Sequence, residues 1–351
     1  MNIIAFIYSL MTETDRGSFW TVPVKWFLYL VSLCYGAGVF VRALLYRSGI
    51  FRSHRAPMKV VSVGNLTLGG TGKTPFVIML SRLIKETLRR EGSVLIRGYG
   101  WDEQAMLKKA LPDVPVIVGE DRVKGAHRSI RLYGSEIAVL DDGFQYWELS
   151  RDLEIVLVDA RDPFGNGHLF PRGILREPKS ALSRADIVVF TKVNKARCDL
   201  EKVKSEIRPV KEGILFLEAV HTPKYFYDVK KRDNVPLESV NGKRVMLLSS
   251  IGDPGYFEDT VKDLNAGIVE HLRFGDHHNY TDRDMKYIAK RCSERKFDCI
   301  VTTEKDFVKL TRLGLYITDC RVMVLAVEMS LVSGKEDLVA RLHSVCSHNN
   351  P

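Results

Sequence analysis

The residues with the clearest chemical potential in this sequence form a glycine-rich run at 69–74, with the sequence GGTGKT. Consecutive small residues let backbone N–H groups curl around phosphate oxygens, and a helix that begins behind such a turn favours the negative charge. In that arrangement the Lys73 ammonium reaches the β- and γ-phosphates of a nucleotide, and the Thr74 hydroxyl binds magnesium. We therefore predict a nucleotide-binding site. It comprises Thr67, Leu68, Gly69, Gly70, Thr71, Gly72, Lys73 and Thr74.

The surroundings of this run depart at one position from the strict phosphate-loop motif G-x-x-x-x-G-K-[ST]. The chain has Thr67 where that motif has its first glycine, which separates it from the ordinary GTPase and ATPase families. An accidental glycine-rich loop is the alternative. An apolar stretch at 60–63 and an apolar helical pattern at 76–84 supply the strand and the helix that a phosphate loop needs, so we favour the nucleotide site.

A second chemical signal is a pair of carboxylates at the end of an apolar stretch, in the sequence IAVLDDGFQ at 137–145. The carboxyl ends of parallel strands are where open α/β sheets bind ligands, so Asp141 or Asp142 would face the phosphate turn. Either could hold Mg²⁺ directly or through water. An ordinary Asp-Asp-Gly turn with solvated acids is the alternative.

Two loops could supply acid–base chemistry. In the sequence RGYGWDE at 97–103, Arg97 could meet a phosphate and Asp102 could act as a base, with an ordinary glycine loop as the alternative. The sequence FGDHHNYT at 274–281 has two adjacent histidines. Neighbouring loop residues seldom share one metal, so a histidine that orients a catalytic carboxylate is favoured over a zinc site. A structural turn is the third reading of this loop.

Three further segments carry polar groups next to expected strands or turns. The sequence RGILREP at 172–178 places two guanidinium groups beside a carboxylate, which suits either a phosphate clamp or a salt-bridged surface loop. The sequence TTEKD at 302–306 could support an active cleft or begin a helix with threonine as its cap. The sequence TKVN at 191–194 is similar to the guanine-reading loop of GTPases, but Asn194 stands where that loop needs an acid.

Taken in order, these motifs resemble the tetraacyldisaccharide 4'-kinase family of lipid A biosynthesis. The resemblance covers almost the whole chain, including a hydrophobic N-terminal helix. Family members tend to have a longer glycine loop before the Asp102 position, and a histidine at the position of Tyr146. The matching motifs are Asn65 to Pro75, Arg97-Gly98-Tyr99-Gly100, Asp141-Asp142-Gly143-Phe144-Gln145, Arg176-Glu177-Pro178, Phe274 with Asp276-His277-His278, and Thr303-Glu304-Lys305-Asp306.

The resemblance implies a kinase that uses ATP and Mg²⁺ to phosphorylate the 4'-hydroxyl of a tetraacylated glucosamine disaccharide 1-phosphate, at the cytoplasmic face of a bacterial inner membrane. It implies a catalytic pair of Asp102 and His277, in which Asp102 draws the proton from the sugar hydroxyl. Asp141, Asp142 and Lys73 would complete the catalytic groups. The implied metal ligands are Thr74, Asp141, Asp142 and Glu177, and the implied clamp for acceptor or phosphate is Arg97, Tyr99, Arg122 and Arg176.

Composition describes an ordinary globular protein. The chain has 351 residues, of which 45% are hydrophobic and 27% charged, which suits about two domains and excludes disordered or collagen-like classes. Its six cysteines form no C-x-x-C pair, so we expect buried thiols in a reducing compartment. No aromatic-interleaved basic strand or recognition helix accompanies the net charge of +9, so nucleic acid is not an expected partner.

The N-terminal part of the chain predicts a membrane-associated helix. Residues 26–41 carry no charge, and residues 1–60 contain seven Lys or Arg against two acids. The uncharged segment would rise only about 24 Å, short of a hydrocarbon core of roughly 30 Å. Snorkelling by Lys25 and Arg42 would bring a tilted span within reach, and the basic flank favours anionic head groups on the cytoplasmic side. A helix lying along the bilayer, a buried core helix and a secretory signal are the alternatives.

Short apolar runs alternate with helical stretches along the rest of the chain, as in doubly wound α/β proteins. We expect a P-loop kinase-type parallel sheet with helices on both faces, a second, smaller α/β domain that closes the cleft, and the membrane-associated helix. The expected boundaries are 1–57, 58–212 and 213–351. The expected strands are 60–63, 93–96, 114–118, 137–140, 155–158, 187–190, 214–218, 244–249, 268–272, 299–302 and 322–327.

The residues alone leave other functions open. One is a membrane-anchored P-loop nucleotide hydrolase that acts as a switch, and another is a non-catalytic membrane scaffold. A nucleotide-dependent partner without lipid phosphorylation would favour the switch, and tight magnesium-dependent ATP binding would exclude the scaffold. The sequence also leaves open whether Asp102, Asp141 or Asp142 accepts the hydroxyl proton, and it indicates no protein partner, oligomeric state or acyl-chain preference.

Overall fold

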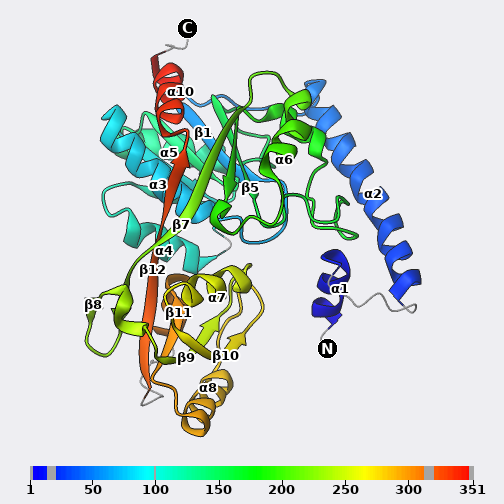
Figure 1. Cartoon of the computed structure of the whole chain (residues 1–351). Helices are drawn as coiled ribbons and strands as arrows, with labels where there is room; N and C mark the ends of the chain where they lie inside the picture. Colours follow the sequence, from blue (N-terminus) through cyan, green and yellow to red (C-terminus); the bar gives the residue numbers. More distant parts are fainter. Residues whose placement is uncertain (1–2, 14–20, 99, 312–319, 348–351) are drawn as a thin grey trace. The chain divides into compact units, whose positions relative to one another are not determined.

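The computed structural model describes residues 3–13, 21–98, 100–311 and 320–347. The chain packs into two units, and both are discontinuous in sequence. The first comprises residues 1–97, 114–220 and 331–351, and the second comprises residues 98–113 and 221–330. Two long strands, β7 (Leu215–Asp228) and β12 (Arg321–Ser333), each pass from one unit into the other (Figure 1).

This division differs from the boundaries expected from the sequence, which ran in order along the chain. The loop and helix at 98–113 belong to the second unit, although their neighbours on both sides belong to the first. The C-terminal helix α10 (Lys335–Ser347) returns to the first unit because β12 carries the chain back there. Strand and helix periodicity report local structure only, so they could not reveal these crossings.

The first unit is built on a parallel sheet in the order β7-β6-β5-β1-β4-β2-β3. Its strands are continuous Val, Ile and Leu runs that are buried on both faces, as parallel strands covered by helices must be. Helices cover both faces, as expected from the sequence. The strands are β1 (Lys59–Asn65), β2 (Gly92–Ile96), β3 (Val116–Val118), β4 (Ile137–Asp141), β5 (Leu153–Asp159), β6 (Ile187–Thr191) and the first part of β7.

The helices of the first unit pack on alternating strand residues. Helices α5 (Arg122–Tyr133) and α6 (Leu200–Ile207) join the clusters formed by residues such as Leu140 and Phe190. Helix α3 (Lys73–Leu83) starts directly after the glycine-rich run and packs against β1, β2 and β4. The run is thereby held between a buried strand and the start of a helix, as the sequence predicted.

The second unit has a smaller sheet in the order β10-β9-β11-β12-β7, and β8 (Asp233–Val235) pairs antiparallel with the end of β7. Strand β9 pairs in parallel with β10 and β11, and β11 pairs in parallel with β12. Two hydrophobic clusters use alternate residues of these strands. The remaining elements are β9 (Arg244–Ser249), β10 (Gly267–Arg273), β11 (Cys299–Thr303), α4 (Trp101–Ala110), α7 (Pro254–Lys262), α8 (Asp282–Arg295) and α9 (Glu304–Thr311).

Every strand expected from the sequence is present. Strands β7 and β12 are much longer than expected, with 14 and 13 residues. Their extra residues are largely polar and only partly buried, so the apolar runs that predicted these strands covered only one end of each.

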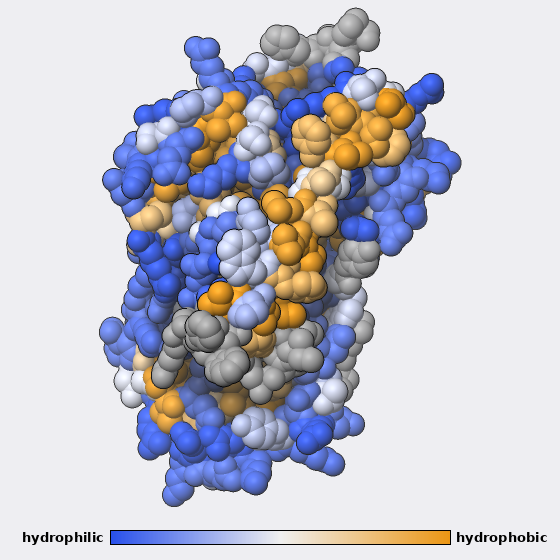
Figure 2. Space-filling view, turned by 90° about the vertical axis from the view of Figure 1, so that its right-hand side faces the viewer, coloured by the Kyte–Doolittle hydropathy of each residue, from blue (hydrophilic) through white to orange (hydrophobic). Residues whose placement is uncertain are grey.

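The N-terminal part of the first unit contains α1 (Ile3–Met11) and α2 (Thr21–Arg47). Within the described part of the chain, α2 alone is long and apolar enough to cross a membrane. Its Trp26, Phe27 and Phe40 side chains are 65%, 64% and 67% exposed, which does not fit a buried core helix. Figure 2 shows a band of hydrophobic surface on this side of the molecule. The exposed face is suited to contact with apolar material.

Candidate active site

The glycine-rich run forms a tight turn at the start of α3. Gly69 and Gly72 have φ angles of 107° and 86°, which L side chains rarely adopt. The turn is also pinned from outside: the Leu68 N–H donates to the Ile174 carbonyl at 2.7 Å, and the Arg176 N–H donates to the Leu66 carbonyl at 2.7 Å. Sequence-distant backbone contacts therefore fix the shape of the predicted phosphate loop.

Asn65, the fully buried last residue of β1, is the centre of the polar contacts around this loop. Its Nδ2 donates to the Thr67 carbonyl at 2.7 Å and lies 3.1 Å from Thr71 Oγ1. Its Oδ1 accepts from Lys73 at 3.3 Å and from Arg176 at 3.2 Å. One side chain thus shapes the loop and gathers two cations beside it.

The two acids at the end of β4 lie next to these cations. Asp141 is buried, and Asp142 adopts a φ of 51°. Asp142 accepts two hydrogen bonds from Arg176, at 2.8 and 3.1 Å, and its Oδ1 lies 3.6 Å from Lys73 Nζ. Burial alone would raise the pKa of Asp142, but Lys73 and Arg176 outweigh it and hold that pKa below its ordinary value. Asp142 is therefore ionised.

Arg122 and Tyr146 form a second cationic arrangement near these acids. The Arg122 guanidinium is 4.4 Å from the centre of the Tyr146 ring, and the Arg122 N–H donates to the Tyr146 hydroxyl at 3.1 Å. That hydroxyl donates to Glu148 at 3.1 Å. Burial lowers the pKa of Arg122, and the charge of Arg97 lowers it further, whereas Tyr146 and Asp142 act in the opposite direction. Tyr146 therefore contacts Arg122 twice, with its ring at the guanidinium and with its hydroxyl at the backbone N–H.

Glu177 is buried, and its two carboxylate oxygens accept hydrogen bonds from Arg184 at 2.8 and 3.1 Å. The Arg184 guanidinium also lies 4.1 Å from the Phe144 ring centre and 4.2 Å from that of Trp147. In this structure Glu177 holds Arg184 in place. Its role as a metal ligand stays a prediction.

The described residues contain no group of three or more His, Cys, Asp or Glu side chains placed to hold a metal ion. A magnesium ion bound with a nucleotide needs only one or two carboxylates, because phosphate oxygens and water supply its other ligands. The side chains of Thr74, Asp141 and Asp142 offer the hard oxygen atoms that Mg²⁺ prefers. The first unit therefore fits magnesium bound together with a nucleotide.

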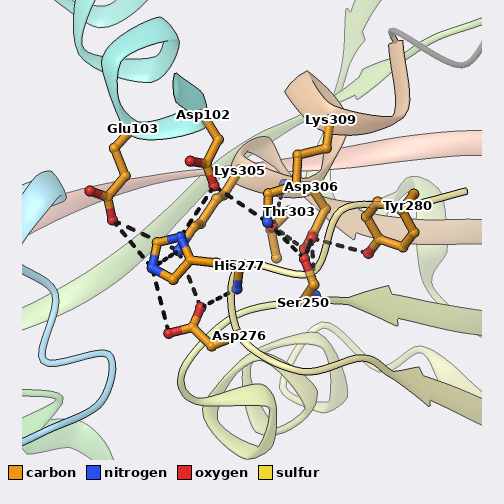
Figure 3. A network of polar contacts seen from close by, with 10 residues as sticks. All are labelled: Asp102, Glu103, Ser250, Asp276, His277, Tyr280, Thr303, Lys305, Asp306 and Lys309. Carbon is orange, nitrogen blue, oxygen red and sulfur yellow. Dashed lines mark hydrogen bonds and ion pairs between the residues drawn. The ribbon is translucent and has the colours of Figure 1, made fainter. Parts of the chain in front are cut away.

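The predicted acid–histidine pair lies within the second unit (Figure 3). Asp102 is the second residue of α4 and is 2% exposed. His277 follows β10, adopts a φ of 58°, and places Nδ1 3.7 Å from Asp102 Oδ2. Its Nε2 lies 3.3 Å from Lys305 Nζ. The two residues of this pair are 175 positions apart in sequence, and the fold brings them together.

Opposing charges set the ionisation of this pair. Burial favours the neutral form of Asp102, but the nearby His277 imidazole and the charges of Lys305 and Lys309 outweigh it, so the Asp102 pKa lies below its ordinary value. The Asp102 carboxylate, 3.7 Å away, is the main cause of a raised pKa for His277, against burial and Lys305. Asp102 is thus a carboxylate beside a histidine that readily becomes charged.

The adjacent histidines do not form a zinc site. His277 faces Asp102, whereas His278 lies 3.0 Å from Asp284 of α8. Because their imidazoles pair with different carboxylates, they share no common metal position.

The structure therefore brings the predicted site residues together in two sets. The phosphate loop, Asp141, Asp142 and the arginines lie in the first unit, and Asp102 and His277 lie in the second. Tyr99, a predicted clamp residue, lies outside the described residues. The sequence did not single out Asn65, Arg184 or Lys309 as site residues. Only the position of Asn65 at the end of the strand before the loop could have drawn attention to it.

Comparisons with known proteins identify the family of the chain. The family described as Tetraacyldisaccharide-1-P 4'-kinase, LpxK, matches residues 24–104 and 100–347. A tetraacyldisaccharide 4'-kinase of Elusimicrobium minutum is 39% identical over 338 residues, which are 89% of this chain and 89% of that protein. Another, of Syntrophus aciditrophicus, is 37% identical over 318 residues, covering 82% of this chain and 85% of that protein.

The fold of the chain is also similar to that of a solved structure. The crystal structure of LpxK from Aquifex aeolicus in complex with ATP has 28% sequence identity and a TM-score of 0.70, and the match covers 92% of this chain and 99% of that one. With the family match over most of the chain, these similarities show that the chain belongs to the tetraacyldisaccharide 1-phosphate 4'-kinase family, a family of kinases in lipid A biosynthesis.

Proposed function

We propose that this protein transfers the γ-phosphate of Mg²⁺-bound ATP to the 4'-hydroxyl of a tetraacylated glucosamine disaccharide 1-phosphate. The observation that carries this proposal is the cluster in which Asn65 and Asp142 gather Lys73 and Arg176 beside the phosphate loop. Phosphoryl transfer needs positioning and charge neutralisation more than covalent catalysis. This cluster supplies both at the end of a buried parallel sheet.

In this proposal each charged residue of the first unit has a role. The backbone of the loop at 67–74 cradles the phosphates, and Lys73 reaches the β- and γ-phosphates. Arg97, Arg122 and Arg176 balance the charge of the transferred group. The proposed magnesium ligands are Thr74, Asp141, Asp142 and Glu177, and the ion would neutralise negative charge on the phosphates when bound.

Asp102 is the proposed acceptor of the hydroxyl proton, and His277 is its partner. Asp142 is less suited to that task because Arg176 and Lys73 already engage its oxygens. Asp102 is ionised and lies within reach of a histidine whose protonation is favoured. The pair can therefore take up the hydroxyl proton, with Asp102 as the acceptor and His277 beside it.

The lipid acceptor accounts for helix α2. Its exposed apolar side chains and the basic residues that follow it suit the cytoplasmic face of an inner membrane. We propose that α2 holds the kinase at the surface where its acylated acceptor resides. A helix that spans the bilayer and a helix that lies along it would both serve this role.

A nucleotide switch is not favoured by the structure of the TKVN segment. Lys192 is 2% exposed and pairs with Asp159 at the end of β5. A lysine engaged in this way is not displayed for reading a base. The kinase proposal therefore stands ahead of the switch.

The proposal is tested with purified protein, γ-labelled ATP and the disaccharide lipid in mixed micelles. Label should move to the lipid, and Lys73→Ala or Asp142→Ala should lower kcat by about a hundredfold or more, because each removes a charged contact to the transferred group or its metal. Lys335→Ala, at an exposed lysine of α10, is the control. Full activity in either site variant would contradict the proposal.

A further inference from the structure

We propose that Lys309 is a positioning residue for the kinase reaction, which holds the Asp102 carboxylate in place and balances its charge. The proposal rests on the proposed function, in which Asp102 accepts the hydroxyl proton. Lys309 lies on α9 and Asp102 on α4, and both elements belong to the second unit. The relevant contacts are drawn in Figure 3.

The contact between the two side chains is buried and direct. Lys309 Nζ lies 3.3 Å from Asp102 Oδ2, and each side chain is 3% exposed. His277 approaches the same oxygen at 3.7 Å, but its side chain is 49% exposed. Lys309 is therefore the partner of Asp102 that solvent screens least.

Both contacts use Oδ2, so Oδ1 is the oxygen that we assign to the incoming hydroxyl proton. The local backbone keeps room beside Oδ1: a Cβ atom at Gly100 would lie 2.6 Å from it. Any side chain at residue 100 would push the carboxylate away. The absence of a side chain at Gly100 and the charge of Lys309 thus act on opposite oxygens of the same group.

Lys309 is itself fixed by a buried polar network. Its Nζ lies 3.0 Å from Ser250 Oγ, and Ser250 gives both its N–H and its hydroxyl to Asp306. Asp306 is fully buried and also accepts hydrogen bonds from Tyr280 at 3.1 Å and Thr303 at 2.7 Å. A buried lysine that also donates to a fixed serine has little freedom to move away from Asp102.

Electrostatics gives this contact a consequence for the reaction. A buried carboxylate without a cation becomes neutral more readily, and a neutral Asp102 cannot accept a proton. The other charged groups around the pair are more exposed: Lys305 lies 3.2 Å from Asp276 and 3.8 Å from Glu103. Lys305 therefore interacts with Asp276 and Glu103 as well, whereas Lys309 forms a buried ion pair with Asp102.

The test compares Lys309→Met, which keeps an apolar stem of similar length, with Lys309→Arg, which keeps the charge. We expect Lys309→Met to lower kcat at pH 7 by about tenfold or more, to move the acid limb of the kcat profile to higher pH, and to leave the KM for ATP unchanged. Lys309→Arg should recover much of kcat and of the pH profile. Lys290→Met, at an exposed lysine of α8 paired with Glu294, is the matched control.

A purely structural role predicts a different result. In that case both Lys309 variants would lose thermal stability, while the pH profile of the remaining folded enzyme would not move, and this result would overturn the proposal. If Lys309→Met does not fold, Ser250→Ala removes a hydrogen bond to the ammonium without removing a charge. We expect a smaller fall in kcat and a smaller shift of the acid limb for Ser250→Ala, and an unchanged profile would count against the proposal.

A double variant separates this proposal from the proposed function. Asp102→Asn should be nearly inactive, and adding Lys309→Met to it should cause no further fall in kcat, because the partner charge is already gone. An active Asp102→Asn enzyme would contradict the assignment of Asp102 as the base. An inactive Asp102→Asn enzyme together with a fully active Lys309→Met enzyme would contradict only the role of Lys309.

Discussion

Arg176 donates hydrogen bonds to both carboxylate oxygens of Asp142, at 2.8 Å to Oδ1 and 3.1 Å to Oδ2. A paired arrangement of this kind needs the planar guanidinium fork, which a lysine lacks. The same guanidinium reaches Asn65 Oδ1 at 3.2 Å. Arg176 is therefore held beside the phosphate loop by two residues, Asn65 and Asp142.

This arrangement predicts that Arg176→Lys will not substitute for the native residue. The variant keeps the positive charge but loses the paired hydrogen bonds, so kcat should fall by about a hundredfold. The free energy of unfolding should change far less, because Asp142 retains Lys73. Steady-state kinetics and urea denaturation measure the two effects, with Arg208→Lys at an exposed arginine as the control. Equal activity in the two variants would contradict the assigned role.

Even an isosteric substitution of Asn65 should weaken the binding of ATP. Asn65→Asp keeps an oxygen for Lys73 and Arg176 but removes the amide that donates to the Thr67 carbonyl. We expect the KM for ATP to rise by about tenfold, because the added negative charge holds both cations away from the phosphates. Asn234→Asp, on the exposed strand β8, is the matched control and should keep the native KM. A native KM in Asn65→Asp would show that the contacts only support the fold.

His277 predicts a particular dependence of stability on pH. Its pKa is raised in the folded protein, chiefly by the nearby Asp102 carboxylate, so its stabilising effect is complete below the unfolded pKa of about 6.5 and is lost as pH rises through the folded pKa. The loss of stability caused by His277→Gln should therefore be larger at pH 6 than at pH 8.5. Urea midpoints at the two pH values measure it, and His343→Gln on α10 is the control. A larger loss at pH 8.5 would contradict the predicted sign.

Tyr146 should act on catalysis mainly through its ring. Tyr146→Phe removes the hydroxyl that meets the Arg122 N–H and Glu148 but keeps the face that stacks on the Arg122 guanidinium. We expect kcat/KM to change little in Tyr146→Phe and to fall by about tenfold in Tyr146→Leu, which loses the cation–π contact. Similar losses in both variants would instead assign the effect to the hydroxyl.

The exposed face of α2 should decide attachment to anionic vesicles. Phe40→Asp places a charge on that face, where the native side chain is 67% exposed, and we expect the affinity for vesicles to fall by roughly tenfold or more. Val332→Asp is the matched control, because Val332 is 60% exposed and lies far along the chain on β12. Co-sedimentation with vesicles measures both. Equal binding by both variants would show that α2 is not the membrane contact.

Much of the fold could be predicted because parallel strands that are buried on both faces are continuous apolar runs in the sequence. Runs such as 155–158 and 187–190 are continuously apolar, and the turns between them contain the expected small and polar residues. The phosphate loop and the Asp141–Asp142 pair could be predicted for a related reason. Their chemistry requires residue types at fixed spacing within one strand and one turn.

The rest depended on contacts between segments that are distant in sequence. Lys309 occupies an ordinary position in an amphipathic helix, and only the packing of α9 against α4 reveals that it faces Asp102. Arg184 is likewise an unremarked basic residue until the fold places it on Glu177. Periodicity assigns a side chain to a face of its own element, but it does not identify the partner on another element.

Helix α2 is connected to the segment around Arg176 by a hydrogen bond from Tyr35. The Tyr35 hydroxyl donates to the Arg176 carbonyl at 2.9 Å, and Ser32 donates to the Leu169 carbonyl at 2.8 Å. The segment that receives both bonds is also hydrogen-bonded to the backbone of the phosphate loop at Leu66 and Leu68. If α2 is bound to a bilayer, these hydrogen bonds would therefore fix the distance between the phosphate loop and the lipid surface.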